Sequence, residues 1–212
     1  MKNLFLLCLG VNFLMFSYGM ADGYHDAMRS TINTLNEARS IEKFQQCANT
    51  FERIAASETK EWLPRYYASY ALIMLSFEEE DVSKRDPILD KAQNFLDQAL
   101  LLAPNESELH VLQAFLYPSR MMVDPMQRGM LFMDKMYSSL ELAKKLNPEN
   151  PRIYFLQANT TLNMPESMGG GSELAKPIFI LADQKFEAFQ PASDIHPDWG
   201  KGANDAELRK LK

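Results

Sequence analysis

Apolar side chains recur at three- and four-residue spacings along almost the whole chain, and alternation by two is nowhere sustained. Spacings of three and four residues place side chains on one face of an α-helix, whereas alternation by two is typical of a half-buried strand. The pattern therefore predicts an all-α protein. The expected helices cover residues 22–38, 40–57, 61–79, 86–103, 106–122, 125–147, 151–164 and 172–189, with a short ninth helix at 203–211.

The expected boundaries carry residues that favour helix starts and stops. Three dipeptides place a capping side chain directly before a proline, which the first turn of a helix tolerates: Asp86-Pro87, Asp124-Pro125 and Asn150-Pro151. Pro104 and Pro148 are expected to end the helices before them, because proline cannot continue the backbone hydrogen-bond pattern.

Two of these helix ends lie in related segments, "LDKAQNFLDQALLLAPNESE" and "MDKMYSSLELAKKLNPENPR". Both carry Asp-Lys near their start and an apolar-x-x-Ala spacing that ends five residues before a proline. Small residues at the outer positions of this pattern let two helices approach, and a large middle residue fills the space between neighbouring hairpins. The repeated positions are Ala92, Leu96, Ala99 and Pro104, then Met136, Leu140, Ala143 and Pro148, then Ala175, Phe179, Ala182 and Glu187. A weaker first copy is Cys47, Phe51 and Ile54.

The preceding helices, "WLPRYYASYALIML", "ELHVLQAFLY" and "RIYFLQANTTL", combine aromatic or leucine residues with an alanine at the expected crossing. Together the paired helices resemble the tetratricopeptide repeat (TPR) family of helix-turn-helix repeats. Successive copies lie about 45, 44 and 39 residues apart instead of about 34, and the extra residues fall mostly inside the hairpins. The resemblance implies one TPR-like superhelix of about four stacked hairpins over residues 22–212.

The N-terminal residues differ from the rest of the chain. Lys2 precedes an apolar run over residues 4–16, and small residues follow up to Ala21. This arrangement predicts a secretory signal peptide over residues 1–21, cleaved after Gly19 or Ala21, with a retained anchor as the alternative. With "NPENPR", "MPESMGGGSELAK" and "HPDWGK", the chain resembles secreted TPR-like proteins of Gram-negative bacteria, which implies a periplasmic or secreted protein.

Charge and cysteine content narrow the possible partners. Cleavage would remove Lys2 and no acidic residue, so the formal net charge would move from -6 to -7. An acidic protein without a basic patch repels nucleic acid and anionic membrane surfaces, and we expect neither nucleic-acid binding nor stable membrane insertion after cleavage. Cys47 would be the remaining cysteine, which excludes an intramolecular disulfide and favours a small core residue.

The segment "PESMGGGSELAKP" contains three consecutive glycines, Gly169, Gly170 and Gly171. A phosphate-binding P-loop needs a lysine and a hydroxyl residue directly after its last glycine, whereas a serine and a glutamate follow here. We therefore expect a structural corner between two helices. The glycines would allow positive φ, Ser172 would cap the next helix, and Pro177 would weaken or kink that helix near its start.

Candidate metal ligands show no local pattern, because His25, His110 and His196 lie in different segments and no HExxH or paired-cysteine spacing occurs. No motif of nucleophilic catalysis is present either. We expect no enzyme activity and no resident metal or cofactor.

A methionine-rich segment, residues 121–136, carries the soft ligands that copper(I) prefers. The spacing of Met126, Met130 and Met133 is more typical of a helix stripe that faces the core or a bound peptide. We favour packing or partner contact over copper.

A binding scaffold is the function that this architecture favours. In stacked hairpins the first helix of each pair lines a concave face, here the helices at 61–79, 106–122 and 151–164. The expected groove residues are Arg65, Tyr66, Tyr70, Gln113, Tyr117, Arg120, Tyr154, Gln157 and Asn159. We expect a non-enzymatic adaptor for a protein or peptide partner in the cell envelope. The alternative is a small-ligand or metal-binding accessory protein of the periplasm, with the methionine segment or the glycine loop as its site.

Overall fold

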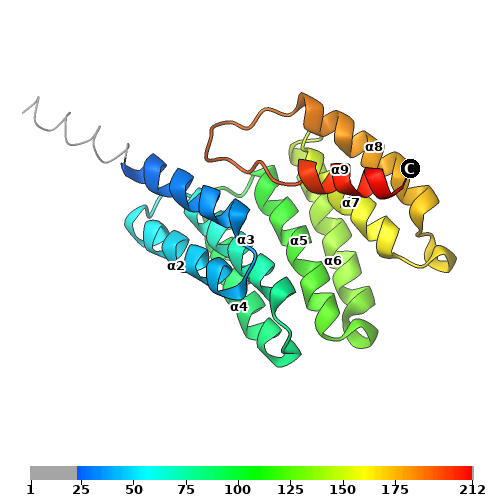
Figure 1. The fold of residues 1–212 in the computed structure, drawn as a ribbon, viewed down its shortest axis with the longest axis horizontal. Helices are drawn as coiled ribbons and strands as arrows, with labels where there is room; N and C mark the ends of the chain where they lie inside the picture. Colours follow the sequence, from blue (N-terminus) through cyan, green and yellow to red (C-terminus); the bar gives the residue numbers. More distant parts are fainter. Residues whose placement is uncertain (1–22, 212) are drawn as a thin grey trace, which may run out of the picture.

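The computed structural model describes residues 23–211, and within this range the chain is helical with no strand (Figure 1). The predicted signal peptide lies outside the described residues. A helix over residues 23–37 comes first. The following helices are α2 (Ile41–Ser57), α3 (Leu63–Glu78), α4 (Val82–Leu102), α5 (Ser107–Val123), α6 (Pro125–Leu146), α7 (Pro151–Asn163), a 3-10 turn (Glu166–Met168), α8 (Ser172–Ala188) and α9 (Lys201–Lys210).

Consecutive helices pack as hairpins that stack side by side (Figure 1). The helix at 23–37 pairs with α2, α3 with α4, α5 with α6 and α7 with α8, while α9 packs on α8. Contacts of α3 with α5 and of α5 with α7 align the first helices of successive hairpins. This arrangement confirms the predicted all-α fold of stacked helical hairpins.

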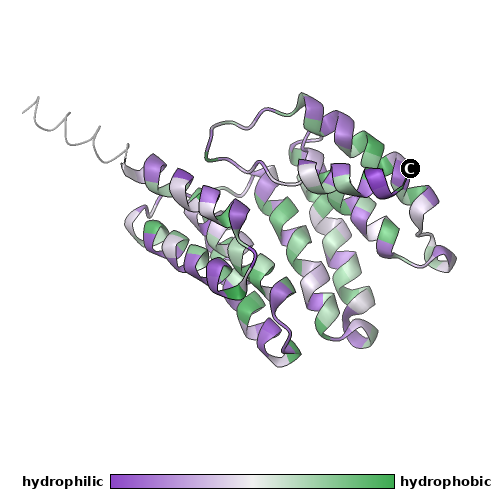
Figure 2. Cartoon of the chain, viewed as in Figure 1, coloured by the Kyte–Doolittle hydropathy of each residue, from purple (hydrophilic) through white to green (hydrophobic). Residues whose placement is uncertain are grey.

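The repeated small and large positions lie in the core, as the spacing predicts. Ala92, Ala99 and Ala143 are fully buried, and so are Leu96 and Leu140 between them. Each helix consequently shows an apolar stripe beside hydrophilic positions (Figure 2).

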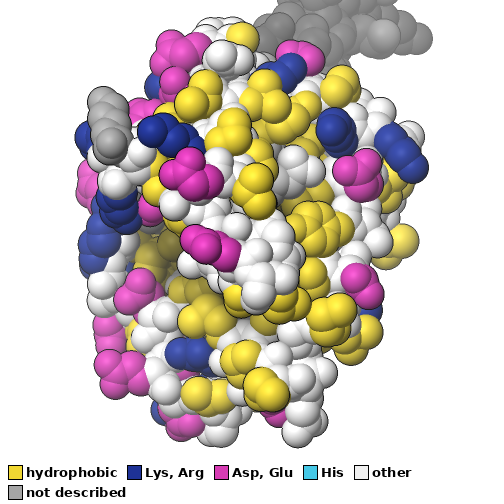
Figure 3. Space-filling model, turned by 90° about the vertical axis from the view of Figure 1, so that its right-hand side faces the viewer, with side chains coloured by type: hydrophobic (Ala, Val, Ile, Leu, Met, Phe, Trp, Pro, Cys, Tyr) yellow, Lys and Arg dark blue, Asp and Glu magenta, His cyan; other side chains and the backbone are white. Residues whose placement is uncertain are grey.

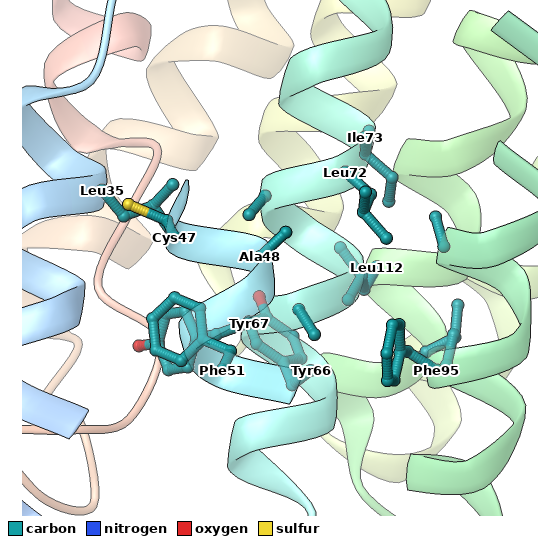
Figure 4. Close-up of a cluster of buried hydrophobic side chains, with 14 of the residues drawn as sticks. Leu35, Cys47, Ala48, Phe51, Tyr66, Tyr67, Leu72, Ile73, Phe95 and Leu112 are labelled. Carbon is teal, nitrogen blue, oxygen red and sulfur yellow. The ribbon is translucent and has the colours of Figure 1, made fainter. Parts of the chain in front are cut away.

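The buried side chains form two clusters, one around α2 to α5 and one around α5 to α8. Cys47 lies in the first cluster at 1% exposure, next to Leu35 in the close-up view (Figure 4). Burial raises the pKa of its thiol, so this cysteine is a core residue, as predicted.

One predicted helix start is wrong. The helix α4 begins at Val82, where the carboxylate of Asp81 accepts a hydrogen bond from the Ser83 amide, so Pro87 lies inside the helix. Asp86 is occupied elsewhere, since its carboxylate accepts hydrogen bonds from Arg120 and Arg128. The other two predicted caps, Asp124 and Asn150, do accept hydrogen bonds from the amides of Gln127 and Arg152.

The glycine run forms the corner between α7 and α8. Gly169 and Gly171 have φ values of 84° and 102°, which L side chains rarely adopt. A side chain on Gly170 would overlap the Met164 carbonyl. The expected serine cap is wrong, because Gly171 occupies the cap position and Ser172 is the first residue of α8. Pro177 lies inside α8, which continues to Ala188 because the missing amide concerns only its first turns.

Candidate ligand-binding site

A non-helical segment of residues 189–200, here called the strap, joins α8 to α9 and reaches back to the first helices (Figure 1). Asp194 of the strap forms an ion pair with Arg29, with a distance of 2.6 Å between Nη2 and Oδ2. Ile195 is 2% exposed and packs in the first core cluster. The strap therefore connects the C-terminal end of the stack with its N-terminal end.

Trp199 of the strap lies among aromatic side chains from three hairpins. Its ring centroid is 5.3 Å from that of Tyr70 on α3 and 5.3 Å from that of Phe115 on α5. Tyr70 and Phe115 are 6.0 Å apart, and Phe155 on α7 lies 6.5 Å from Trp199. Tyr70, Phe115 and Trp199 are each half-buried, so all three keep some contact with solvent. We call these three residues the aromatic surface.

Two hydrogen bonds hold Trp199 in this position. Its indole Nε1 donates to the Tyr66 hydroxyl at 2.7 Å, and its carbonyl accepts from Arg152 Nη1 at 3.1 Å. The next residue, Gly200, has φ of 108°, and a Cβ there would lie 2.8 Å from the Phe186 ring. The chain can turn from the strap into α9 at this point because the residue is glycine.

A buried ion pair lies beneath Trp199. Arg152 on α7 is fully buried and donates two hydrogen bonds to the carboxylate of Glu108 on α5, at 2.8 and 2.6 Å. Asn150 adds a third hydrogen bond to this carboxylate at 2.8 Å. Burial raises the pKa of the Glu108 carboxyl, and the charge and hydrogen bonds of Arg152 oppose this rise.

Hydrophobic side chains line a hollow in the molecular surface when the molecule is viewed from the end where α7 turns into α8 (Figure 3). A concave apolar surface with a few polar groups at its edge is typical of a small-ligand site.

Comparison with solved structures finds a similar helical protein that aligns over most of this chain. It is the HusA haemophore from Porphyromonas gingivalis, with a TM-score of 0.80 and 29% sequence identity, and the alignment covers 89% of this chain and 92% of that chain. No family model matches the chain, and no curated protein is significantly similar to it. The helical stack is thus shared with a known protein, whereas membership of the TPR family stays a prediction.

The structure brings two of the predicted groove residues together. Tyr70 belongs to the aromatic surface, and Tyr66 lies directly behind it, fully buried. Gln157 and Asn159 are half-buried on α7, and the Asn159 amide donates to the Phe155 carbonyl of its own helix.

The other five predicted groove residues contact neighbouring helices or the chain just after them, and their place in a groove stays a prediction. Arg65 donates to backbone carbonyls at and after the end of α2. On α5, Gln113 bonds Gln93 of α4, and Arg120 bonds Asp86 and Asp90 of the same helix. Tyr117 stacks on Phe132 of α6. On α7, the Tyr154 hydroxyl donates to the Pro148 carbonyl just after α6. Residue type suggested these positions, but the face of the helix decides which way each side chain points.

The residues that the sequence reasoning missed are Phe115, Arg152, Glu108 and Trp199. Phe115 lies in the quoted phrase "LQAFLY" and Trp199 in "HPDWGK", so both segments were recognised without their roles. Trp199 and Tyr66 are 133 residues apart in the chain, and no local pattern encodes that contact.

The histidines are dispersed in the structure as well. His25 is exposed on the first helix, and burial lowers the pKa of His196, which hydrogen-bonds Ser193 in the strap. His110 Nε2 lies 2.9 Å from the Pro104 carbonyl oxygen, and the Tyr154 hydroxyl makes the same contact with Pro148 one repeat later. His110 is thus a repeat-equivalent of a structural tyrosine. Among residues 23–211 no three His, Cys, Asp or Glu side chains gather as a metal site.

The methionine segment does not face the core throughout. Met126 and Met130 are 94% and 68% exposed at the tip of the α5–α6 hairpin, whereas Met133 is half-buried against the second core cluster. Met126 and Met130 therefore do not face the core, and contact with a partner is the expected role that remains for them. No helix within residues 23–211 is long and apolar enough to cross a membrane.

Proposed function

We propose that this chain is a secreted, non-enzymatic binding protein for haem or a closely related tetrapyrrole. The aromatic surface of Tyr70, Phe115 and Trp199 carries this proposal. The similarity to a haemophore over nine-tenths of both chains supports it, and so does the predicted signal peptide.

A porphyrin is a flat, mostly apolar ring system, and the aromatic surface offers flat, mostly apolar partners. Tyr70 and Trp199 are stacked at an interplanar angle of 20°, and Phe115 is tilted by 33° from Trp199. Offset-stacked aromatic pairs contribute about 0.5–1.5 kcal/mol each beyond the area that they bury. A macrocycle placed on this surface would stack on rings that three hairpins and the strap hold in place.

The Tyr70 side chain offers a ligand on the aromatic surface an uncharged and mostly apolar contact. Burial raises the pKa of the Tyr70 hydroxyl far above its usual range, so the side chain stays an uncharged phenol at physiological pH. Cys47 is closed off in the core at 1% exposure and does not reach the surface. The chain's own part in binding is therefore to stack on the ring and exclude water from one of its faces.

Titration of the purified mature protein with haemin tests this proposal. We expect saturable binding of one haemin per chain with a Kd of about 1 μM or lower, seen as a shift of the Soret band. Phe115→Leu should weaken binding by about three- to tenfold, because it removes one stacked ring and keeps an apolar side chain.

Phe132→Leu is the matched control. Phe132 is also half-buried, but it lies on α6 and stacks on Tyr117, away from the aromatic surface. Its replacement should leave the Kd for haemin unchanged. A folded wild-type protein that does not bind haemin, or equal Kd values for the two variants, would contradict the proposal.

A protein-binding role is a second candidate, carried by a different surface. Met122, Met126, Met130 and Leu131 are exposed at the tip of α5–α6. Exposed methionine-rich surfaces adapt to many apolar partners. Met126→Gln with Met130→Gln should abolish capture of an envelope protein while leaving haemin binding intact, if this tip is the contact.

A further inference from the structure

We infer that Trp199 forms a wall of the ligand site, and that Tyr66 and Arg152 act as positioning residues that hold its indole ring in place. This inference rests on the proposed function. It assigns the strap to the binding site.

The position of Trp199 is not set by regular secondary structure, because the strap is non-helical. A large side chain on such a segment has several rotamers open to it unless other groups select one. An indole has a single donor and no acceptor, so a hydrogen bond to Nε1 orients the whole ring. That bond is made at 2.7 Å by the hydroxyl of Tyr66.

Tyr66 is itself held firmly. It is fully buried on α3, and its ring packs edge-on against Tyr67 at 5.2 Å and Trp62 at 5.8 Å. Its hydroxyl is therefore presented to the strap from a rigid position and cannot be reached by a ligand on the aromatic surface. Tyr66 therefore acts on the ligand only through Trp199, as a positioning residue.

Arg152 contacts the strap near both of its ends. Its guanidinium lies 4.5 Å from the ring centroid of Phe189, where the strap begins, and it donates to the carbonyl of Trp199, near where the strap ends. Glu108 fixes the orientation of the guanidinium with two hydrogen bonds. Because Glu108 is on α5 and Arg152 on α7, the strap is tied to two further hairpins.

The indole ring is thereby ordered before any ligand arrives. Ordering a side chain during binding costs affinity, and a ring that is already fixed avoids this cost. Loss of the Tyr66 hydroxyl should consequently weaken binding even though this hydroxyl does not touch the ligand. The effect should appear mainly as faster dissociation of the complex.

The test compares Tyr66→Phe with Tyr67→Phe in haemin titrations. Both variants lose one buried tyrosine hydroxyl, at adjacent positions of α3. The Trp199 indole donates to the hydroxyl of Tyr66, whereas Tyr67 stacks on Phe51 of α2 at 5.2 Å (Figure 4). Tyr66→Phe should raise the Kd by about three- to tenfold, the range of one lost hydrogen bond. Tyr67→Phe should leave it within about twofold of wild type. Both variants are compared in buffer in which circular dichroism shows them fully folded.

A second variant, Trp199→Leu, should raise the Kd at least as much as Tyr66→Phe, because it removes the wall itself. Tighter binding by Trp199→Leu would instead show that the indole competes with the ligand, and would overturn the inference. Equal Kd values for Tyr66→Phe, Tyr67→Phe and wild type would overturn it as well, with the proposed function intact. Failure of the wild-type protein to bind haemin would overturn both.

Discussion

At the scale of single residues, the three glycines at the α7–α8 corner are needed for different reasons. Gly169 and Gly171 adopt positive φ, whereas Gly170 is buried where the chain passes close to the Met164 carbonyl. Backbone hydrogen bonds from Gly170 to Pro165 and from Gly171 to Thr161 close the corner. The corner is a packed structural element rather than a phosphate-binding loop.

Gly170→Ala should lower the free energy of unfolding by about 1–3 kcal/mol, because the new methyl group has no room beside a backbone carbonyl. Gly129→Ala is the control, since Gly129 lies inside α6 with nothing within 4 Å of its added Cβ. Alanine should stabilise the helix there by about 0.5–1 kcal/mol. Urea denaturation measures both values, and equal effects would contradict the account of the corner.

The contacts of Asp86 predict how the stability of the protein should change with pH. Arg128 binds both of its carboxylate oxygens at 2.8 Å, and Arg120 binds one at 3.0 Å. Hydrogen bonds from Arg128, then those from Arg120, lower the pKa of the carboxyl below its usual value. A lowered pKa in the folded state means that the stabilisation is present above the unfolded pKa of about 3.9 and is lost at lower pH.

Asp86→Asn should therefore lower the free energy of unfolding by about 1 kcal/mol at pH 7, a value that allows for solvent screening at a side chain that is 32% exposed. The difference from wild type should shrink as the pH falls from 4 to 3, because protonation removes the same charge from the wild-type protein. Asp90→Asn, at a carboxylate that is 71% exposed, should have a smaller effect at pH 7. A pH-independent difference for Asp86→Asn would contradict this assignment.

At the scale of elements, helical periodicity was sufficient to predict where most helices lie. The start of α4 was not predictable in this way, because Asp86-Pro87 has the residues of a helix cap while Asp81 provides the actual one. A proline near a helix start is compatible with the first turns, so the dipeptide alone does not distinguish the two positions.

The strap could not be predicted from local pattern, because long-range contacts decide its path. Asp194 meets Arg29 across 165 residues, and Trp199 meets Tyr66 across 133. Its sequence shows only that no helix forms there. For the same reason the prediction found Tyr66 and Tyr70 from their residue type and helix but missed the tryptophan that joins them.

The groove residues show a related limit of sequence reasoning. Gln113, Tyr117 and Arg120 lie on the first helix of a hairpin, as expected, but on the side that contacts α4 and α6. Phe115, two residues from Gln113, points instead to Trp199. A sequence gives the helix on which a residue lies, but without the rotation of that helix about its axis it does not give the direction of the side chain.

At the scale of the whole molecule, the strap adds contacts between hairpins that are not neighbours in the stack. Stacked hairpins make contacts mainly with their neighbours, which leaves an open concave face. Here the strap crosses from the last hairpin to the first and places an aromatic side chain against α3, α5 and α7. The strap thereby adds an aromatic side chain to a face that stacked hairpins otherwise leave open, and this is the feature on which the proposed binding of a flat small ligand rests.

The most direct test of this account follows the two tryptophan indole signals by NMR during titration with gallium(III) protoporphyrin IX, a diamagnetic analogue of haem. The chain contains two tryptophans, Trp62 and Trp199, so each indole N–H signal can be assigned with one substitution. The account predicts a large shift for Trp199 and a smaller one for Trp62, because the ring current of a porphyrin falls steeply with distance. Saturable binding that leaves the Trp199 signal unmoved, with shifts confined to the methionine tip of α5–α6, would contradict the central claim.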